Sequence, residues 1–267
     1  MAETDEGDFP LMIKPKVCIL RTDGTNCDEE LFYAFEKAGA APSMVHVNSL
    51  REKDEKLKNY QILALPGGFS YGDDVASGKI LAVELISFLK DELANFINIK
   101  GVILGICNGF QTLVRTGLLP FNNLGKMDVT LAGNESGHFE CRWVSVKVED
   151  SKCLFLSGQN KMLDMAVNHG EGKFYAQPSV IQKVEDGNLV VFRYVDTNGK
   201  PTQNYPQNPN GSVNAIAGVS DPSGRILGLM PHPEKFVDLT QHPNWRRDKN
   251  LKPSGAIIFE NMVAFVK

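Results

Sequence analysis

Apolar and polar positions alternate along the first 110 residues in a way that predicts short buried strands separated by helices. Apolar runs typical of buried strands occur at residues 16–20, 44–47, 62–65 and 102–106. Residues 28–39 carry apolar side chains at helical spacing, and 80–95 form a second predicted helix. This alternation is typical of an α/β protein with a doubly wound, mostly parallel sheet and helices on both faces, whose ligands bind at the carboxyl ends of the strands.

The pattern changes after about residue 128. Short segments of alternating polarity, such as 142–148 and 189–194, predict the strands of a small antiparallel addition. Residues 203–214 contain two prolines, one glycine and four asparagines, a composition typical of a loop. We find no repeat and no linker, and therefore predict one domain at residues 15–267, preceded by an acidic tail at residues 1–14.

The run at 102–106 leads into the first candidate chemistry. Gly105, Cys107 and Gly109 are spaced as Gly-x-Cys-x-Gly between a predicted strand and a predicted helix. This setting is typical of a nucleophile elbow, in which small flanking residues allow the sharp turn. Cys107 is the candidate nucleophile, and we expect the start of the helix at Asn108 to lower its pKa. The alternative is a buried structural cysteine.

A second candidate group lies near the end of the chain. Another short apolar run precedes the sequence PHPE at 231–234. Residues two apart in an extended chain face the same side, so Glu234 can orient the ring of His232 while its other nitrogen faces Cys107. A surface turn is the alternative for this proline-flanked histidine.

The third candidate follows the run at 62–65, where Gly67 and Gly68 come directly after a proline. Glycines leave their backbone amides unobstructed, so an amide of Gly67 or Gly68 could join the amide of Asn108 in an oxyanion hole. Taken alone, the two glycines are equally typical of a plain turn after a strand.

In this order, the three segments resemble the triad-type (class I) glutamine amidotransferase family. Within it the chain is similar to the glutaminase subunits of phosphoribosylformylglycinamidine synthase, in their separately encoded, archaeal-type form. The resemblance covers roughly residues 15–265 and is carried by the sequences TDGTNCDEE (22–30), PGGFSYGDDVASGK (66–79), GICNGFQ (105–111), FECRWV (139–144), HGEGKF (169–174), NPNGS (208–212) and GLMPHPE (228–234).

The resemblance implies hydrolysis of glutamine to glutamate, with ammonia channelled to a partner that makes formylglycinamidine ribonucleotide in purine biosynthesis. Cys107, His232 and Glu234 would form the catalytic triad, and Gln111 and Phe69 would contact glutamine. The implied partners are an ATP-dependent synthetase subunit, which uses ATP and Mg²⁺, and a small bridging subunit.

Two positions depart from the family pattern. His138 stands where many members have an arginine, and Asn168 precedes the HGEG sequence where a small or apolar residue is usual. These departures leave open whether His138 or Arg142 helps to hold substrate or partner, and the roles of His169 and Glu171 are also left open. Residues 72–79 resemble a phosphate-binding loop but lack its spacing and its final hydroxyl residue, so we expect neither an ATP site nor another cofactor in this chain.

Composition restricts the remaining possibilities. A net charge of −4 and a pI near 5.8 argue against a nucleic-acid-binding protein. The five cysteines form no CxxC pair, which favours a reducing cytoplasm over a disulfide framework or a metal site. No apolar run is long enough for a membrane span, and the acidic start is unlike a signal peptide.

Three alternatives stay open. The chain could be a glutaminase that feeds another synthetase, a DJ-1-like cysteine protein, or a non-catalytic regulatory subunit. Glutamine turnover would exclude the regulatory subunit, and dependence on the synthetase would separate the favoured function from the others.

Overall fold

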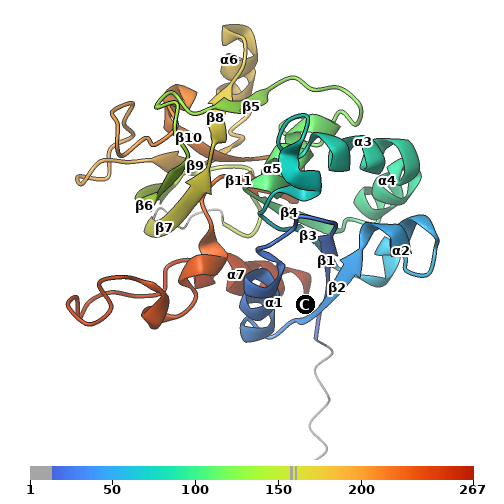
Figure 1. Ribbon diagram of the computed structural model, residues 1–267. Helices are drawn as coiled ribbons and strands as arrows, with labels where there is room; N and C mark the ends of the chain where they lie inside the picture. Colours follow the sequence, from blue (N-terminus) through green and yellow to red (C-terminus); the bar gives the residue numbers. More distant parts are fainter. Residues whose placement is uncertain (1–13, 157–158, 160) are drawn as a thin grey trace, which may run out of the picture.

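The computed structural model describes residues 14–156, 159 and 161–267, and one large sheet runs through it (Figure 1). The sheet has nine strands in the order β2-β1-β3-β4-β11-β10-β9-β6-β7, and β5 and β8 form a separate pair. The predicted tail at 1–14 falls almost wholly outside the described residues. The strands are β1 (Lys16–Arg21), β2 (Ala41–His46), β3 (Ile62–Leu65), β4 (Val102–Ile106), β5 (Thr130–Gly133), β6 (Glu140–Val148), β7 (Met162–His169), β8 (Glu171–Tyr175), β9 (Val190–Tyr194), β10 (Ile216–Ser220) and β11 (Ile226–Leu229).

Helices cover both faces of the half that contains β1 to β4. Helices α1 and α7 pack together on one face, while α3, α4 and α5 lie on the other (Figure 1). Each residue of β3, β4 and β11 is buried, because neither face of these strands meets water. The helices are α1 (Asp28–Lys37), α2 (Val47–Arg51), α3 (Lys79–Phe88), α4 (Lys90–Asn98), α5 (Asn108–Thr116), α6 (Pro178–Asp186) and α7 (Ala256–Val266).

The other half of the sheet is antiparallel. Strand β11 runs parallel to β4 but antiparallel to β10, and the pairs β10–β9, β9–β6 and β6–β7 are also antiparallel. The predicted antiparallel addition therefore continues the main sheet across the β11–β10 junction. The predicted fold class, a mostly parallel doubly wound sheet with an antiparallel addition, is confirmed.

Two predicted elements differ in detail. The helix predicted at 80–95 is two helices, because Leu89 leaves helical geometry at φ −118° and ψ 12°. Leu85, Leu89 and Leu93 are all buried at a spacing of four residues, so the apolar pattern is continuous across the bend. The strand predicted at 44–47 begins earlier, at Ala41, because an edge strand is partly exposed and carries a weaker apolar signal.

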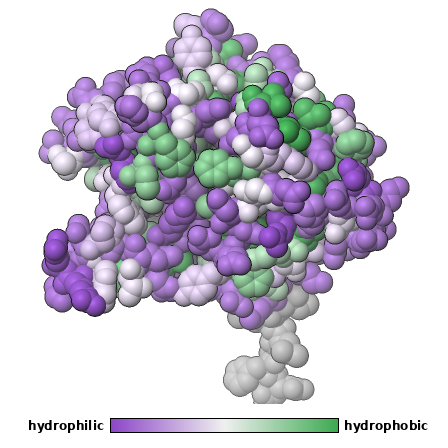
Figure 2. Space-filling model, in the orientation of Figure 1, coloured by the Kyte–Doolittle hydropathy of each residue, from purple (hydrophilic) through white to green (hydrophobic). Residues whose placement is uncertain are grey.

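The surface seen in Figure 2 is mostly hydrophilic, with apolar side chains near the middle of the view and toward the side of α3 and α4. Within the described residues, no helix has the length and apolar character needed to cross a membrane.

Candidate active site

The three predicted catalytic segments follow β3, β4 and β11, which are neighbours in the sheet. These strands are parallel, so their carboxyl ends meet at one edge. Gly67 lies just beyond β3, Cys107 directly after β4, and His232 shortly after β11. The topology therefore brings together residues that are up to 165 positions apart in the sequence.

The turn at Cys107 has the geometry of a nucleophile elbow. Cys107 has φ 52° and ψ −105°, a backbone strain of about 1–3 kcal/mol that the surroundings must offset. Its amide donates to the Leu229 carbonyl at 2.8 Å, and its carbonyl accepts from the Gln111 amide at 2.9 Å. A Cβ on Gly109 would lie 2.0 Å from the Leu65 carbonyl oxygen, which explains why this position must be glycine.

The space around Gly67 shows how close together the catalytic groups lie. A Cβ at Gly67 would lie 2.6 Å from His232 Cε1 and 3.4 Å from Cys107 Cβ. His232 Nδ1 is 2.5 Å from Glu234 Oε1, and both side chains are almost fully buried. His232 Nε2 has no hydrogen-bond partner within the described part of the chain. The imidazole is thus oriented by Glu234, with its second nitrogen free for a reacting group.

The pKa of the Cys107 thiol contradicts the sequence prediction. Burial raises this pKa well above its usual range, and the nearby Cys27 and Glu234 raise it further. The amide of Asn108 lowers it, as the helix start was expected to do, but the effect of burial is larger. The thiol is therefore protonated at rest, and its proton must be removed during the attack. The Cys107 Sγ donates to the Asn168 carbonyl oxygen at 3.5 Å.

The backbone amides of Asn108, Gly67 and Gly68 remain available for an oxyanion. The Cys107 amide is already bonded to Leu229, whereas the Asn108 amide faces the Cys107 sulfur closely enough to lower its pKa. The Gly67 carbonyl accepts from the Cys27 amide at 3.3 Å, and we find no acceptor for the amides of Gly67 or Gly68 among the described residues. At Gly68, φ is +132°, which favours glycine.

The loop after Gly68 is tied to the start of α5 through Asn108. Its Oδ1 accepts from Ser70 Oγ at 2.6 Å, and its Nδ2 donates to Asp73 Oδ1 at 3.0 Å. The same Nδ2 lies 3.2 Å from Gln111 Oε1, and Gln111 Nε2 donates to the Glu171 carbonyl at 2.5 Å. Gln111 is therefore buried and bonded to β8, while Ser70 and Asp73 fix the elbow in a way that the sequence did not reveal.

Phe69, the other predicted glutamine contact, has an exposed side chain. Its ring centroid is 6.3 Å from that of Phe139, which is also exposed. The backbone of Phe69 is held by Gly24, whose carbonyl accepts the Phe69 amide at 3.0 Å. This side chain therefore lies at the surface, directly next to the oxyanion loop.

His169 is buried behind the catalytic groups. Burial lowers its pKa to about 3, with a further contribution from His232, so the ring is neutral at physiological pH. Its Nδ1 is 3.1 Å from Asn134 Oδ1, and its Nε2 is 3.5 Å from Asn210 Nδ2. Asn210 belongs to the NPNGS sequence, which is buried apart from the partly exposed Gly211.

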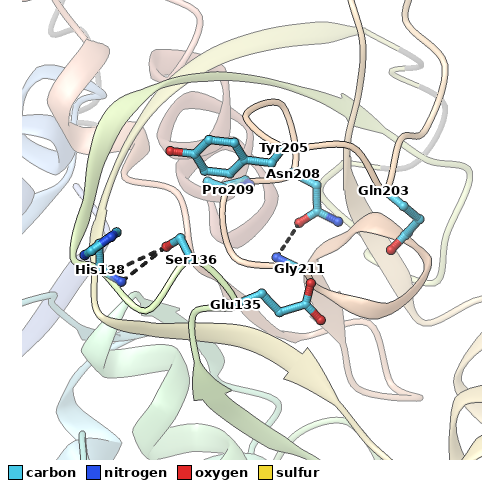
Figure 3. A pocket seen from close by; sticks show the side chains of 8 residues that line it. All are labelled: Glu135, Ser136, His138, Gln203, Tyr205, Asn208, Pro209 and Gly211. Carbon is cyan, nitrogen blue, oxygen red and sulfur yellow. Dashed lines mark hydrogen bonds between the residues drawn. The ribbon is translucent and has the colours of Figure 1, made fainter.

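His138 and Tyr205 line a separate hollow of about 350 Å³ (Figure 3). No predicted catalytic residue lines it. Within it, Asn208 Oδ1 accepts from the Gly211 amide at 3.1 Å, which shapes the loop. The lining residues are Glu135, Ser136, His138, Gln203, Tyr205, Asn208, Pro209 and Gly211.

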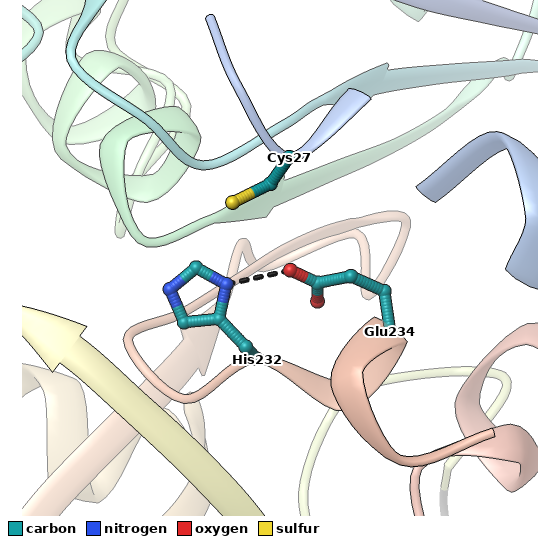
Figure 4. A group of neighbouring side chains, drawn as sticks. All are labelled: Cys27, His232 and Glu234. Carbon is teal, nitrogen blue, oxygen red and sulfur yellow. Dashed lines mark hydrogen bonds and ion pairs between the residues drawn. The ribbon is translucent and has the colours of Figure 1, made fainter. Parts of the chain in front are cut away.

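Cys27 is a neighbour of the catalytic groups that the sequence prediction missed. It lies in the loop after β1, and its sulfur points toward the His232 ring (Figure 4). Burial and, to a smaller extent, the negative charge of Glu234 raise the pKa of the Cys27 thiol to about 12. Its position after a buried parallel strand was the available signal, because the carboxyl ends of such strands share one edge.

Comparison with known proteins gives consistent similarities. Residues 14–266 match the family described as the CobB/CobQ-like glutamine amidotransferase domain. The chain is 47% identical over 259 residues to phosphoribosylformylglycinamidine synthase subunit PurQ of Dehalococcoides mccartyi, covering 96% of this chain and 99% of the relative. It is 41% identical over 254 residues to the subunit of the same name from Methanococcus maripaludis, covering 94% and 93%.

Solved structures show the same likeness. A chain in the structure of PurLQS from Thermotoga maritima superposes with a TM-score of 0.72 at 31% identity, covering 95% of this chain and 100% of that one. The glutaminase domain of Trypanosoma brucei CTPS, at 13% identity and a TM-score of 0.55 over 94% of each chain, shares the fold.

Proposed function

The chain belongs to the CobB/CobQ-like glutamine amidotransferase family, and from this premise we propose that it is the glutaminase subunit of a phosphoribosylformylglycinamidine synthase. It hydrolyses L-glutamine to glutamate and ammonia. A synthetase partner uses the ammonia to convert formylglycinamide ribonucleotide to formylglycinamidine ribonucleotide in purine biosynthesis. The PurQ relatives support the choice of synthase, and the glutaminase step is supported by the geometry around Gly67, where an added Cβ would lie 3.4 Å from Cys107 Cβ and 2.6 Å from His232 Cε1.

The reaction begins when the Cys107 sulfur attacks the side-chain amide carbon of glutamine. Because burial raises the pKa of this thiol, His232 Nε2 takes its proton as the S–C bond forms. Glu234 holds Nδ1 and stabilises the imidazolium that results. The C–N bond then breaks, and His232 returns the proton to the departing nitrogen, which leaves as ammonia.

The second half of the reaction releases glutamate. A water molecule loses a proton to His232 and attacks the thioester carbon, after which the C–S bond breaks and the Cys107 thiol is restored. In both halves of the reaction, the negatively charged oxygen of the tetrahedral intermediate is bound by the Asn108 amide and an amide of Gly67 or Gly68. Removal of one such donor typically costs about 100-fold to 1,000-fold in rate.

Gln111 and Phe69 both contribute to the glutamine pocket. Gln111 is fixed by its bond to the Glu171 carbonyl and braces Asn108 next to the nucleophile. Phe69 follows the oxyanion glycines at the exposed rim, where an entering substrate passes.

The partner supplies the energy-requiring chemistry. We place ATP and Mg²⁺ in an ATP-dependent synthetase subunit and expect no cofactor in this chain, together with a small bridging subunit in the complex. A complex is needed because free ammonia becomes ammonium at neutral pH and loses its nucleophilic electron pair. The cytoplasmic location indicated by the cysteine content stays a prediction.

Glutamate release tests this function. We expect slow release by the purified chain and a large increase with the synthetase partners, formylglycinamide ribonucleotide and ATP. Cys107→Ala should abolish glutamine-dependent synthesis by the complex and retain synthesis from ammonium salts. Glutamate release that persists in Cys107→Ala would refute the nucleophile, and release that never responds to the partners would refute the assigned complex.

A further inference from the structure

A third buried ligand atom accompanies the His232–Glu234 pair. The Cys27 sulfur, one ring nitrogen of His232 and one carboxylate oxygen of Glu234 all lie within 4.8 Å of one another (Figure 4). Exposed fractions are 5% for Cys27, 1% for His232 and 0% for Glu234. The hydrolysis described above gives no role to Cys27.

Glu234 carries an unused acceptor in the same cluster. Its Oε1 is occupied by His232, but its Oε2 is buried with no hydrogen-bond partner among the residues that the structure describes. An unpaired buried carboxylate oxygen is costly, and a cation is one of the few ligands that can offset that cost. Figure 4 shows Oε2 turned away from Cys27, so the carboxylate must rotate to bring this oxygen toward a cation bound between the three residues.

The three groups match the preferences of zinc. Thiolate, imidazole and carboxylate are its usual protein ligands, and one thiolate with one carboxylate neutralises a divalent charge in a buried site. Ligand atoms of a tetrahedral zinc lie about 3.3–3.8 Å apart, given bond lengths of about 2.0–2.3 Å. To bind zinc, the Cys27 sulfur must move slightly closer to the other two ligand atoms, and Glu234 must move slightly away from His232.

We propose that Cys27, His232 and Glu234 form an inhibitory site for a divalent cation of the zinc class. The cation takes the imidazole nitrogen that Glu234 holds in the active state, and the thiol proton of Cys27 leaves to solvent. His232 is then neither oriented nor free to accept the Cys107 proton. The three ligands are distant in the sequence, which is why cysteine spacing alone predicted no metal site. Only the inhibition rests on the proposed function; the binding does not.

One positive charge opposes this binding. Lys235 lies near the Cys27 sulfur, and its positive charge competes with a cation for that sulfur. Lys235 is only partly buried, and its Nζ already lies 3.2 Å from the Asn168 side-chain oxygen when that amide is oriented to accept.

Cobalt absorption tests the site without any enzyme activity. The full-length Cys107→Ala/Cys141→Ser protein lacks the nucleophile and the exposed cysteine, and Co²⁺ is added to it. We expect a thiolate-to-cobalt charge-transfer band that saturates at one equivalent. The band should disappear with Cys27→Ser and persist with Cys153→Ser, which alters another buried cysteine. Absence of a saturable band, or a band unchanged by Cys27→Ser, would overturn the proposal.

Zinc inhibition tests the consequence. Glutamate release is titrated with Zn²⁺ and reversed with a chelator, and each variant is normalised to its own metal-free rate. We expect Cys27→Ser to require at least tenfold more zinc for half-inhibition than wild type. Equal sensitivity would place the inhibitory zinc on Cys107 and His232 and would refute the inhibitory role of Cys27. If glutamate is released neither by the chain alone nor with the synthetase partners, the proposed function fails while the cobalt experiment still decides the site.

Discussion

The two halves of the central sheet contribute differently to the site. The parallel half supplies the proposed nucleophile, base and oxyanion loop from the ends of three neighbouring strands. The antiparallel half supplies contacts that hold these groups: the His232 amide donates to the Ala166 carbonyl at 2.8 Å, and the Cys107 thiol faces the Asn168 carbonyl. The reacting groups therefore lie at the ends of parallel strands, and contacts with β7 hold them in place.

This difference follows from strand direction. Parallel strands end at one edge, where loops converge and backbone amides remain available for a ligand. Antiparallel strands alternate in direction, so their loops are divided between two edges, and their polar side chains pair within the protein. We therefore expect substitutions in the parallel half to change rate, and substitutions in the antiparallel half to change stability.

The largest effect is expected for Glu234→Gln. An amide keeps the size of the side chain but cannot stabilise the imidazolium of His232, and loss of acid–base catalysis should lower kcat about 1,000-fold. Stopped-time assays of glutamate release would measure this. Glu185→Gln, which removes a carboxylate bonded to Arg193 in the antiparallel half, is the matched control. A similar loss of kcat in both variants would break the comparison.

Gly67→Ala should have the next largest effect. The added methyl group would lie 2.6 Å from His232 Cε1, so the imidazole must move. Misplacement of a catalytic group by about 1 Å can cost about 100-fold in rate. Gly133→Ala in β5, where a methyl group meets nothing within 4 Å, should retain the full rate. Full activity of Gly67→Ala would show that His232 is not the base.

Asn210→Ala should act on stability instead. It leaves the buried Tyr194 hydroxyl without its 3.2 Å partner and removes the Ser212 contact at 2.7 Å. We expect the free energy of unfolding to fall by about 1–3 kcal/mol. Urea denaturation would measure it, and kcat should stay within about threefold of wild type because no reacting atom is touched. A large loss of kcat without destabilisation would give this loop a direct role.

A further effect is expected on the pH dependence of stability. The pKa of His169 is lowered to about 3 in the folded protein, below its unfolded value of about 6.5. Between about pH 3 and pH 6.5 the unfolded chain therefore binds a proton at His169 that the folded chain does not. The stabilisation that the neutral ring gives to the folded protein is complete above pH 6.5 and is lost as pH falls toward 3.

His169→Gln isolates this contribution. The slope of unfolding free energy against pH should be smaller in the variant by up to about 1.4 kcal/mol per pH unit. Denaturation at several pH values between 4 and 7 would measure it, with both proteins losing stability from carboxylates equally. Identical slopes would mean that His169 is protonated normally in the folded state.

The sequence predicted those parts of the site that depend on local chemistry. The Gly-x-Cys-x-Gly turn, the PHPE sequence and the two glycines each lie directly after a buried strand, so short apolar runs were enough to locate them. The break at Leu89 was missed because buried leucines continue through it at helical spacing. Cys27 was missed because it joins Glu234 only through loops that follow different strands, so no short motif of fixed spacing connects them.

The sequence by itself determined the strand and helix order of the parallel half, the family, and the residues that can form the triad, because hydrophobic periodicity and turn chemistry act over a few residues. Only the tertiary structure determined the pKa values and which distant residues lie side by side. Burial raises the pKa of Cys107 against the effect of the helix start, and places Cys27 beside His232. Desolvation depends on how completely distant segments exclude water, a quantity that no short stretch of sequence contains.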